Sequence, residues 1–141
     1  MLNLIGACGV GGDGTLSAAQ ALQYSLDPEM KALLDIIMGG KTIDNDMAHC
    51  DTAIGFMTSV FKSQETILNG LNLAHGKSTT AVVDLYGRDN GHIALHATSL
   101  VKGNHPLITL LSEKPISRDV FFRRHAELKK KHGYVCVVVA E

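Results

Sequence analysis

The sequence has no excess of basic residues, because 13 Lys and Arg stand against 14 Asp and Glu and give a net charge of −1 at pH 7. A nucleic-acid partner is therefore not expected, although a local site for phosphate remains compatible with this balance. No stretch is apolar for long enough to span a membrane. The apolar start of the chain also has no charged segment of the kind that opens a signal peptide. We expect a cytoplasmic protein with no nucleic-acid partner and no membrane partner.

Cysteine is scarce, and its three occurrences are Cys8, Cys50 and Cys136. Their spacing matches neither a zinc motif nor a disulfide framework, so we expect buried free thiols in a reducing compartment. The sequence also has no internal repeat and no low-complexity tract. What remains is a chain of 141 residues with 45% hydrophobic and 19% charged residues. This length and composition are typical of a single globular domain, here residues 1–141.

Short apolar runs alternate with segments of helical spacing along the chain. Strands are predicted at residues 2–8, 80–85, 107–111 and 134–140. Helices are predicted at residues 15–24, 52–72, 93–101 and 117–132, and Gly133 follows the last of them as a stop signal. The segment 29–38 begins like a helix and ends like a strand, and Gly39 and Gly40 are expected to break the chain after it. The residues predicted on the buried face of helix 52–72 are Ile54, Val60, Phe61, Ile67 and Leu68.

The alternation of strands and helices predicts crossover connections and therefore a mostly parallel sheet. Continuous apolar strands, such as VCVVVA at residues 135–140, are typical of a sheet that helices cover on both faces. The expected fold class is thus three-layer α/β. In such folds ligands bind at the carboxyl ends of the strands, and four unusual loops follow predicted strands or glycine breaks in this chain.

The first of these loops is GGDGT at residues 11–15, between a predicted strand and a predicted helix. Glycines let the backbone approach a phosphate closely, and the helix that follows offers free N–H groups to an anion. Asp13 would repel phosphate unless a Mg²⁺ ion binds the carboxylate and the phosphate oxygens together. Taken alone, the segment is also compatible with a tight turn in which Asp13 caps the helix.

The second loop is KTIDND at residues 41–46, directly after the glycine pair. Its two carboxylates, Asp44 and Asp46, suit a paired task in which one accepts a proton from a hydroxyl and the other holds a metal. Lys41 offers a positive charge for a phosphate. A polar turn, in which Asp and Asn side chains bond their own backbone, explains the same residues equally well.

The third and fourth loops each carry one charged candidate. In YGRDNG at residues 86–91, Arg88 stands between glycines at the end of a strand, where its planar fork can bind a phosphate. In LSEKP at residues 111–115, Glu113 follows an apolar strand and can accept hydrogen bonds from a sugar hydroxyl. A solvated surface arginine and a structural glutamate are the alternatives for these two loops.

Together the four loops resemble the phosphofructokinase family, in the same order along the chain. GGDGT resembles its nucleotide-phosphate loop and KTIDND its catalytic loop, followed by the helix DTAIGFMTSV. YGRDNGHIALHATSL resembles its arginine loop and helix, LLSEKPIS a strand end that carries a glutamate, and YVCVVVAE the next core strand. GGDGT alone also occurs in NAD kinases and lipid kinases, whereas the second and third motifs argue against those enzymes. The resemblance implies an incomplete phosphofructokinase-like fold.

The resemblance implies a role for each matched residue. On the donor side, Gly12, Gly14 and Thr15 would line the donor phosphates, while Asp13 and Asp46 would bind or support Mg²⁺, the implied cofactor. Asp44 would be the general base for the C1 hydroxyl of fructose 6-phosphate, and Arg88 would stabilise the transferring group. The residues implied to contact the sugar phosphate are Thr42, Ile43, Asp44, Tyr86, Gly87, Arg88 and Glu113.

The resemblance also bears on the phosphoryl donor. Pyrophosphate users of the family tend to carry aspartate where Gly14 stands, so Gly14 leaves room for a nucleotide. Lys41 is typical of pyrophosphate users but also of one subgroup of ATP users, which the third and fourth loops resemble. We therefore expect ATP as the donor, with pyrophosphate as the second choice.

Several family segments have no counterpart in this sequence, among them the glycine-rich first strand and the histidine–arginine substrate motif. Apolar edges and faces are therefore expected to be exposed, which predicts a homo-oligomer or an aggregation-prone chain. The alternative to an active kinase is a non-catalytic remnant that binds nucleotide or Mg²⁺.

Overall fold

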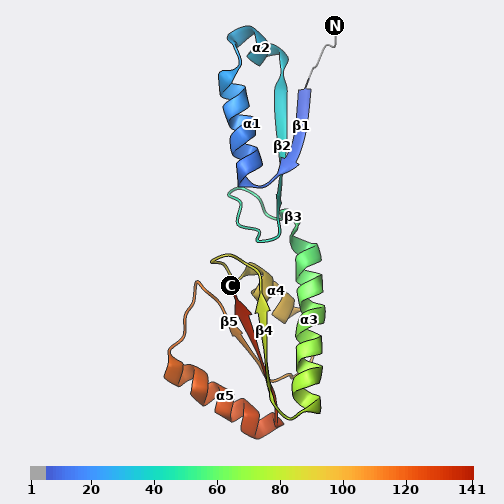
Figure 1. Ribbon diagram of the computed structural model, residues 1–141, viewed down its shortest axis with the longest axis vertical. Coiled ribbons are helices and arrows are strands. Elements are labelled where there is room, and N and C mark those ends of the chain that lie inside the picture. The colour runs from blue at the N-terminus through green and yellow to red at the C-terminus, as the bar shows by residue number, and fades with distance from the viewer. Residues whose placement is uncertain (1–5) are drawn as a thin grey trace.

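The computed structural model describes residues 6–141, which form six strands and five helices (Figure 1). The strands are β1 (Gly6–Gly11), β2 (Asp35–Thr42), β3 (Ile54–Gly55), β4 (Thr80–Leu85), β5 (Leu107–Leu110) and β6 (Val135–Ala140). The helices are α1 (Asp13–Ser25), α2 (Pro28–Leu33), α3 (Phe56–Gly76), α4 (His92–Ser99) and α5 (Arg118–His132). Every pairing between these strands is parallel, which confirms the α/β class and the parallel strands. No helix in this part of the chain is long and apolar enough to cross a membrane.

The strands divide between two sheets, with the orders β1-β2-β3 and β4-β6-β5. The first sheet ends at β3, which pairs with β2 through only two residue pairs before the chain enters α3. Gly55 makes this change of direction with a φ of 100°, a conformation that side chains rarely adopt. We call residues 6–55 the N-terminal lobe and residues 56–141 the C-terminal lobe; Figure 1 shows them as the upper and lower parts of the molecule.

The C-terminal lobe has the three layers expected from the sequence. On one face of its sheet, Cys136 and Val138 of β6 belong to a core cluster with buried residues of α3 and α4. On the other face, Val135 and Val137 of β6 pack with Ile108 of β5 and with residues of α5. This double burial explains why the β6 sequence is apolar at every position. Helix α5 reaches the start of β4, where His125 Nε2 lies 2.9 Å from Thr80 Oγ1. Further along β4 the side chain of Val82 is 67% exposed.

The N-terminal lobe is covered on one face only. Ile36 and Met38 of β2 line a hollow together with residues of α1, so that alternation along the strand turns Ile37 to the opposite face. Ile37 is 68% exposed there, and Val10 and Ile54 of the same sheet are also exposed. The apolar surface expected from the sequence is therefore present in the structure.

The glycine pair and the start of α3 differ from the sequence predictions. Gly39 and Gly40 do not break the chain but continue β2, where they pair with Val10 and Gly11 of β1. Met47 packs on Gly40 so closely that a Cβ there would lie 2.8 Å from its Sδ atom. Helix α3 starts at Phe56, four residues after the predicted start at 52. Of the side chains predicted on its inner face, Val60 and Ile67 are buried, whereas Ile54, Phe61 and Leu68 are exposed.

The first strand and the cysteines also need correction. The predicted strand 2–8 appears as β1 over Gly6–Gly11, and residues 2–5 lie outside the described part of the chain. The three thiols are free, but only Cys136 is buried, since Cys8 is exposed and Cys50 is half-buried. Cys8 lies on a strand with no helix over its outer face, and therefore the expectation of three buried thiols was wrong.

Candidate functional site

The 11–15 loop joins β1 directly to α1. Gly12 is the N-cap of the helix, and its carbonyl oxygen accepts hydrogen bonds from the N–H groups of Thr15 and Leu16, at 2.9 and 3.0 Å. Gly11 must lack a side chain, because a Cβ there would collide with the side chain of Thr15. The side chain of Asp13 is exposed and makes no capping hydrogen bond to the helix. The carboxylate is thus free for a ligand, and the alternative role of Asp13 as a cap is not seen.

The 41–46 loop is an ordered turn in which the carboxylates take no part. Thr42 Oγ1 accepts a hydrogen bond from the Asp44 N–H at 3.2 Å. Asn45 adopts a left-handed backbone with φ of 55°, and its Oδ1 accepts from the Ala53 N–H at 2.7 Å. Within residues 6–141 the carboxylate oxygens of Asp44 and Asp46 accept no hydrogen bond. Thr42 and Asn45 therefore build the turn and leave both carboxylates for other chemistry.

The 86–91 loop holds Arg88 in a strained turn. The Asn90 N–H donates to the carbonyl oxygen of Gly87 at 3.3 Å, while Arg88 and Asp89 between them have φ of 43° and 62°. Two successive positive φ values are the pattern of a type I′ turn, which favours Asn and Gly. For other residues this conformation costs about 1–3 kcal/mol each and is found most often at functional sites. The strain therefore singles out Arg88 as a functional candidate.

These three loops meet at one cavity of about 500 Å³ between the two lobes, which we call the cleft. Its walls combine the glycines of the 11–15 loop, both carboxylates of the 41–46 loop and the arginine of the 86–91 loop. The residues that line it are Gly12, Asp13, Gly14, Lys41, Thr42, Ile43, Asp44, Asp46 and Arg88. In Figure 1 the loop after β4 reaches from the C-terminal lobe toward the loop after β2. A cavity with three carboxylates, a lysine and an arginine suits a phosphate ligand together with a cation.

Four residues predicted for the site do not line the cleft. Thr15 lies in the first turn of α1 against Gly11, and Gly87 is buried in the turn that carries Arg88. Tyr86 is exposed and lines a smaller hollow of about 210 Å³ beside Asp84, Leu85 and Glu141. The fourth residue is Glu113.

The structure places Glu113 at the start of α4, where its Oε1 accepts a hydrogen bond from the Gly91 N–H at 2.7 Å. This bond to the Gly91 backbone, with smaller help from its own backbone N–H and from His92, lowers the pKa of the Glu113 carboxyl below its usual range. The carboxylate therefore links the 86–91 loop to the chain after β5 and does not line the cleft. The contact with sugar hydroxyls expected from the fourth loop stays a prediction.

Sequence reasoning missed Glu141. This residue follows β6, and its N–H donates to the carbonyl oxygen of Leu85 at 3.0 Å, which brings it beside the end of β4. The signal was present in the sequence, because Glu141 is a carboxylate directly after an apolar strand, as Glu113 is.

The comparison with known proteins identifies the family. The family model for phosphofructokinase matches residues 2–141. The chain belongs to the phosphofructokinase family. It is 38% identical over 138 residues to an ATP-dependent 6-phosphofructokinase of Entamoeba histolytica, a match that covers 94% of this chain and 30% of that protein. It is 31% identical over 132 residues to a pyrophosphate–fructose 6-phosphate 1-phosphotransferase of Thermoproteus tenax, covering 94% of this chain and 36% of the relative.

Solved phosphofructokinase structures share the fold of this family member. The pyrophosphate-dependent enzyme of Nitrosospira multiformis superposes with a TM-score of 0.82 at 23% identity, over 96% of this chain and 36% of that one. Phosphofructokinase of Saccharomyces cerevisiae superposes with a TM-score of 0.76 at 24% identity, over 97% of this chain and 20% of that one. The chain thus spans roughly a third of the length of the curated relatives described above.

The cleft of this phosphofructokinase chain can accommodate a magnesium ion that arrives with phosphates. Within residues 6–141 no three His, Cys, Asp or Glu side chains form a group that could hold a metal alone. Asp13, which follows β1, and Asp46, which follows β2, nevertheless line the same cavity. Mg²⁺ is typically bound by one or two carboxylates plus substrate phosphates and water, rather than by a cage of protein ligands. The residues present therefore fit a Mg²⁺–phosphate complex.

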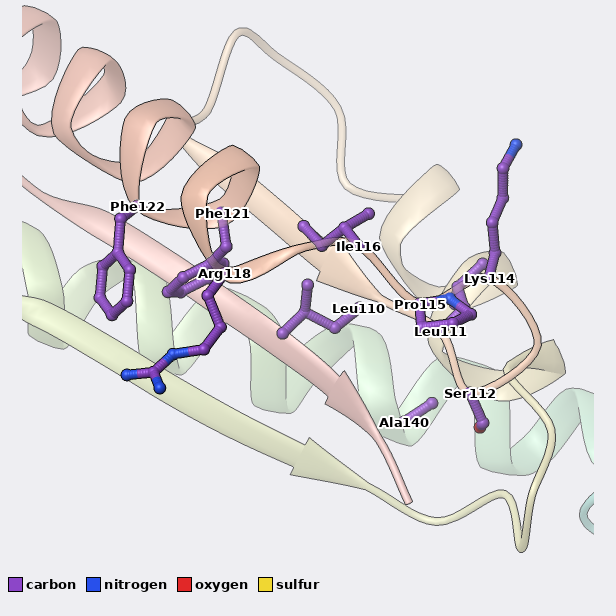
Figure 2. Close-up of a pocket in the computed structure, with 10 residues that line it drawn as sticks. All are labelled: Leu110, Leu111, Ser112, Lys114, Pro115, Ile116, Arg118, Phe121, Phe122 and Ala140. Atoms are coloured by element: carbon purple, nitrogen blue, oxygen red, sulfur yellow. The ribbon is translucent and has the colours of Figure 1, made fainter.

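A second cavity, of about 400 Å³, lies beside the start of α5 (Figure 2). Figure 2 shows Leu110, Ile116 and Phe121 around it, with Arg118 extended beneath the helix. Apart from Lys114 and Arg118 its lining carries no charged side chain, and none of the predicted site residues lines it. Its apolar character adds to the exposed apolar surface of the C-terminal lobe.

Proposed function

We propose that the cleft transfers the terminal phosphoryl group of ATP to the C1 hydroxyl of fructose 6-phosphate, which gives fructose 1,6-bisphosphate, a step of glycolysis. The observation that carries the proposal is that Asp13, Asp44 and Arg88, from three separate loops, line one cavity. Phosphoryl transfer passes through a loose transition state that needs positioning and charge neutralisation more than covalent chemistry. A cytoplasmic location follows from these substrates as part of the same proposal.

On the donor side, the start of α1 provides backbone N–H groups for phosphate oxygens, next to Gly12, Gly14 and Thr15. Asp13 would hold Mg²⁺, with Asp46 in support. When bound, this ion neutralises the charge that develops on the transferring phosphoryl group. Asp13 thereby serves a purpose that a purely anion-binding loop does not explain.

On the acceptor side, Asp44 would take the proton of the sugar hydroxyl as a general base. The hydrogen bond that Thr42 Oγ1 accepts from the Asp44 N–H involves only the backbone of Asp44. The Asp44 carboxylate is left without a hydrogen bond within the described residues, as the role of a base requires. Arg88 would place its guanidinium on the transferring phosphoryl oxygens, and Lys41 adds a second positive charge in the same cavity. Ile43 forms the apolar part of the same wall.

The sugar would extend toward the end of β4. Tyr86 and Gly87 precede Arg88 there, and Glu141 lines the hollow beside Tyr86. A carboxylate at that place offers an acceptor for sugar hydroxyls, the role first expected of Glu113. We assign Glu113 instead to holding the 86–91 loop, through its bond to Gly91.

Two donors remain candidates, and ATP is favoured. A Cβ at Gly14 would meet no other heavy atom of the described residues within 4 Å, so the loop is open where a nucleotide needs space. Lys41 in the cleft favours pyrophosphate as the second choice. Similar proteins of both donor classes exist, as those of Entamoeba histolytica and Thermoproteus tenax illustrate.

A second candidate function is binding of nucleotide and Mg²⁺ without turnover. It is favoured by Gly12, Asp13 and Gly14, which line the cleft and suit a Mg²⁺–nucleotide complex whether or not an acceptor binds. A separate feature is the exposed apolar sheet face around Ile37. We propose that this face makes the chain self-associate or aggregate unless a partner covers it. A monodisperse monomer with a cooperative melt, in light scattering and thermal unfolding, would contradict this part of the proposal.

The deciding experiment measures fructose 1,6-bisphosphate formed from fructose 6-phosphate by the purified chain, with Mg²⁺ and either ATP or pyrophosphate. We expect turnover with ATP that Asp44→Asn abolishes. Asp51→Asn is the matched control, because Asp51 lies exposed in the same connection but does not line the cleft. A folded sample that turns over neither donor, but binds ATP in the presence of Mg²⁺, would replace the kinase by the binding function.

A further inference from the structure

The imidazole ring of His92 contacts the backbone of the 41–46 loop. His92 is the first residue of α4 in the C-terminal lobe, and its Nδ1 lies 3.3 Å from the carbonyl oxygen of Asp44 and 3.1 Å from that of Asn45. Within residues 6–141 these are the only side-chain hydrogen bonds that join the two lobes. The contact therefore stands at the place where the proposed base meets the lobe that carries Arg88.

The partners fix the chemistry of this contact. A backbone carbonyl oxygen can only accept a hydrogen bond, so Nδ1 of His92 has to carry the hydrogen that both carbonyls share. The neutral ring is then the Nδ1–H tautomer, and its Nε2 atom is unprotonated. We infer that His92 is a positioning residue, which holds the Asp44 backbone against the C-terminal lobe through its Nδ1–H group.

Hydrogen bonds and burial hold His92 firmly in the C-terminal lobe. Its N–H donates to Asn90 Oδ1 at 3.1 Å, and its carbonyl oxygen accepts from Nδ1 of His96 at 2.8 Å. The next residue along α4, Ile93, is completely buried in the core cluster of the C-terminal lobe. Glu113 fixes the residue before His92 by its bond to Gly91. A ring anchored in this way can restrain the more exposed loop that it contacts.

The other restraints on the loop do not have this effect. Thr42 bonds within the loop, and Asn45 ties it to Asp51 and Ala53, all of which belong to the N-terminal lobe. These bonds fix the shape of the loop but not its distance from Arg88. His92 supplies the missing restraint and so sets the separation of base and arginine across the cleft. This inference rests on the proposed function for its catalytic consequence, but not for the contact itself.

The contact is tested without turnover by nuclear magnetic resonance of the ¹⁵N-labelled chain. In the neutral ring of the wild type we expect His92 to show protonated Nδ1 and unprotonated Nε2. The amide hydrogens of Asp44 and Ala53, which are bonded within the loop, should exchange about two- to tenfold faster in His92→Phe, which has no donor. His92→Asn should restore slow exchange, because its amide can donate near the Nδ1 position. Leu95→Ala is the matched control on the same helix and should leave exchange unchanged, because the Leu95 side chain is about half exposed and takes no part in the bonds that anchor His92.

The neutral Nε2–H tautomer in the wild type would overturn the inference, even if His92→Phe fails to fold. Unchanged exchange in His92→Phe, or acceleration that His92→Asn does not reverse, would overturn it as well. If the wild type turns over, His92→Phe should lower kcat by about 10- to 100-fold with little change in KM for fructose 6-phosphate, and His92→Asn should recover most of it. Absence of turnover in the wild type contradicts the proposed function alone, because the tautomer and exchange results still decide the role of His92.

Discussion

Gly70 lies where α3 crosses its sheet, and the structure leaves no room for a side chain there. A Cβ at this position would lie 2.7 Å from Val83 Cγ2 and 3.4 Å from Cys136 Sγ. Val83 belongs to β4 and Cys136 to β6, and both are buried. Real Cβ atoms do not approach another carbon so closely, and the branched valine side chain cannot swing aside as a long flexible one could. Gly70→Ala should therefore push α3 away from the sheet.

The size of the effect follows from two opposing contributions. Overpacking of a filled core costs about 1–3 kcal/mol. Alanine in place of glycine inside a helix returns about 1 kcal/mol. We expect Gly70→Ala to lower the free energy of unfolding by up to about 2 kcal/mol, which for a chain of this length lowers Tm by up to about 8 °C. The sign is the sharper prediction, because the same substitution normally stabilises a helix.

Urea denaturation and thermal melting followed by circular dichroism measure this effect. Gly76→Ala is the matched control, since it lies in the same helix and a Cβ there would meet no heavy atom of the described residues within 4 Å. It should be neutral or stabilising by up to about 1 kcal/mol. Gly70→Ala above wild-type stability would refute the close packing of α3 on β4. In a double-mutant cycle, Val83→Ala should cost less in the Gly70→Ala background than in the wild type.

Three further predictions concern local backbone and ionisable groups. Ser78 ends α3 in a left-handed conformation with φ of 48°, so Ser78→Gly should raise the free energy of unfolding by about 1 kcal/mol in urea melts, and a loss of stability would contradict the assigned backbone. The pKa of Glu113 is lowered in the folded state, so its ionised form stabilises the fold at pH values above the ordinary pKa of 4.5. This stabilisation disappears as the pH falls through the pKa of the folded state. The difference in Tm between the wild type and Glu113→Gln should therefore be present at neutral pH and vanish in acid. Burial raises the pKa of the Cys136 thiol from 9.0 to about 11. The stabilisation of the fold by the neutral thiol is therefore complete below pH 9 and is lost toward pH 11. At pH 11 the free energy of unfolding of the wild type should have fallen by about 2 kcal/mol more than that of Cys136→Ala. Equal pH profiles of the two proteins would show that the thiol is not buried.

Residues that mark the ends of helices and strands in the sequence made part of the fold predictable. The strand at residues 80–85 was placed at the bounds of β4, and the helix at 117–132 matches α5 because Ser117 caps it and Gly133 ends it with a φ of 80°. The glycine pair does not form the predicted break, because glycine is also compatible with the extended backbone of a strand. The packing of Met47 on Gly40 depends on the fold of the following loop, which the local sequence does not reveal. The division into two sheets was likewise unpredictable, since it depends on how short β3 is.

The site was predictable where it depends on strand ends and not where it depends on neighbours. Residues of the first three loops gather at one cavity, as the position of each loop after a parallel strand suggests. The sequence offers two carboxylates after apolar strands, Glu113 and Glu141, and cannot show which of them the start of α4 engages. The contact of His92 with Asp44 joins residues 48 positions apart. No local pattern marks such a contact, and for this reason sequence reasoning passed over His92.

Burial is distributed unevenly between the two lobes. The buried apolar side chains of the described residues all lie from Ala53 onward, whereas α1 and α2 contribute none. Regions with little buried apolar surface open at lower free energies than the core of the same molecule. The half of the cleft that bears Asp13 and Asp44 is therefore the first part of the protein to unfold, and heat or denaturant should abolish phosphate binding before the C-terminal lobe melts. A ligand that binds the cleft only when the N-terminal lobe is folded then raises the stability of that lobe most, so that ligand binding and local folding are coupled in one equilibrium.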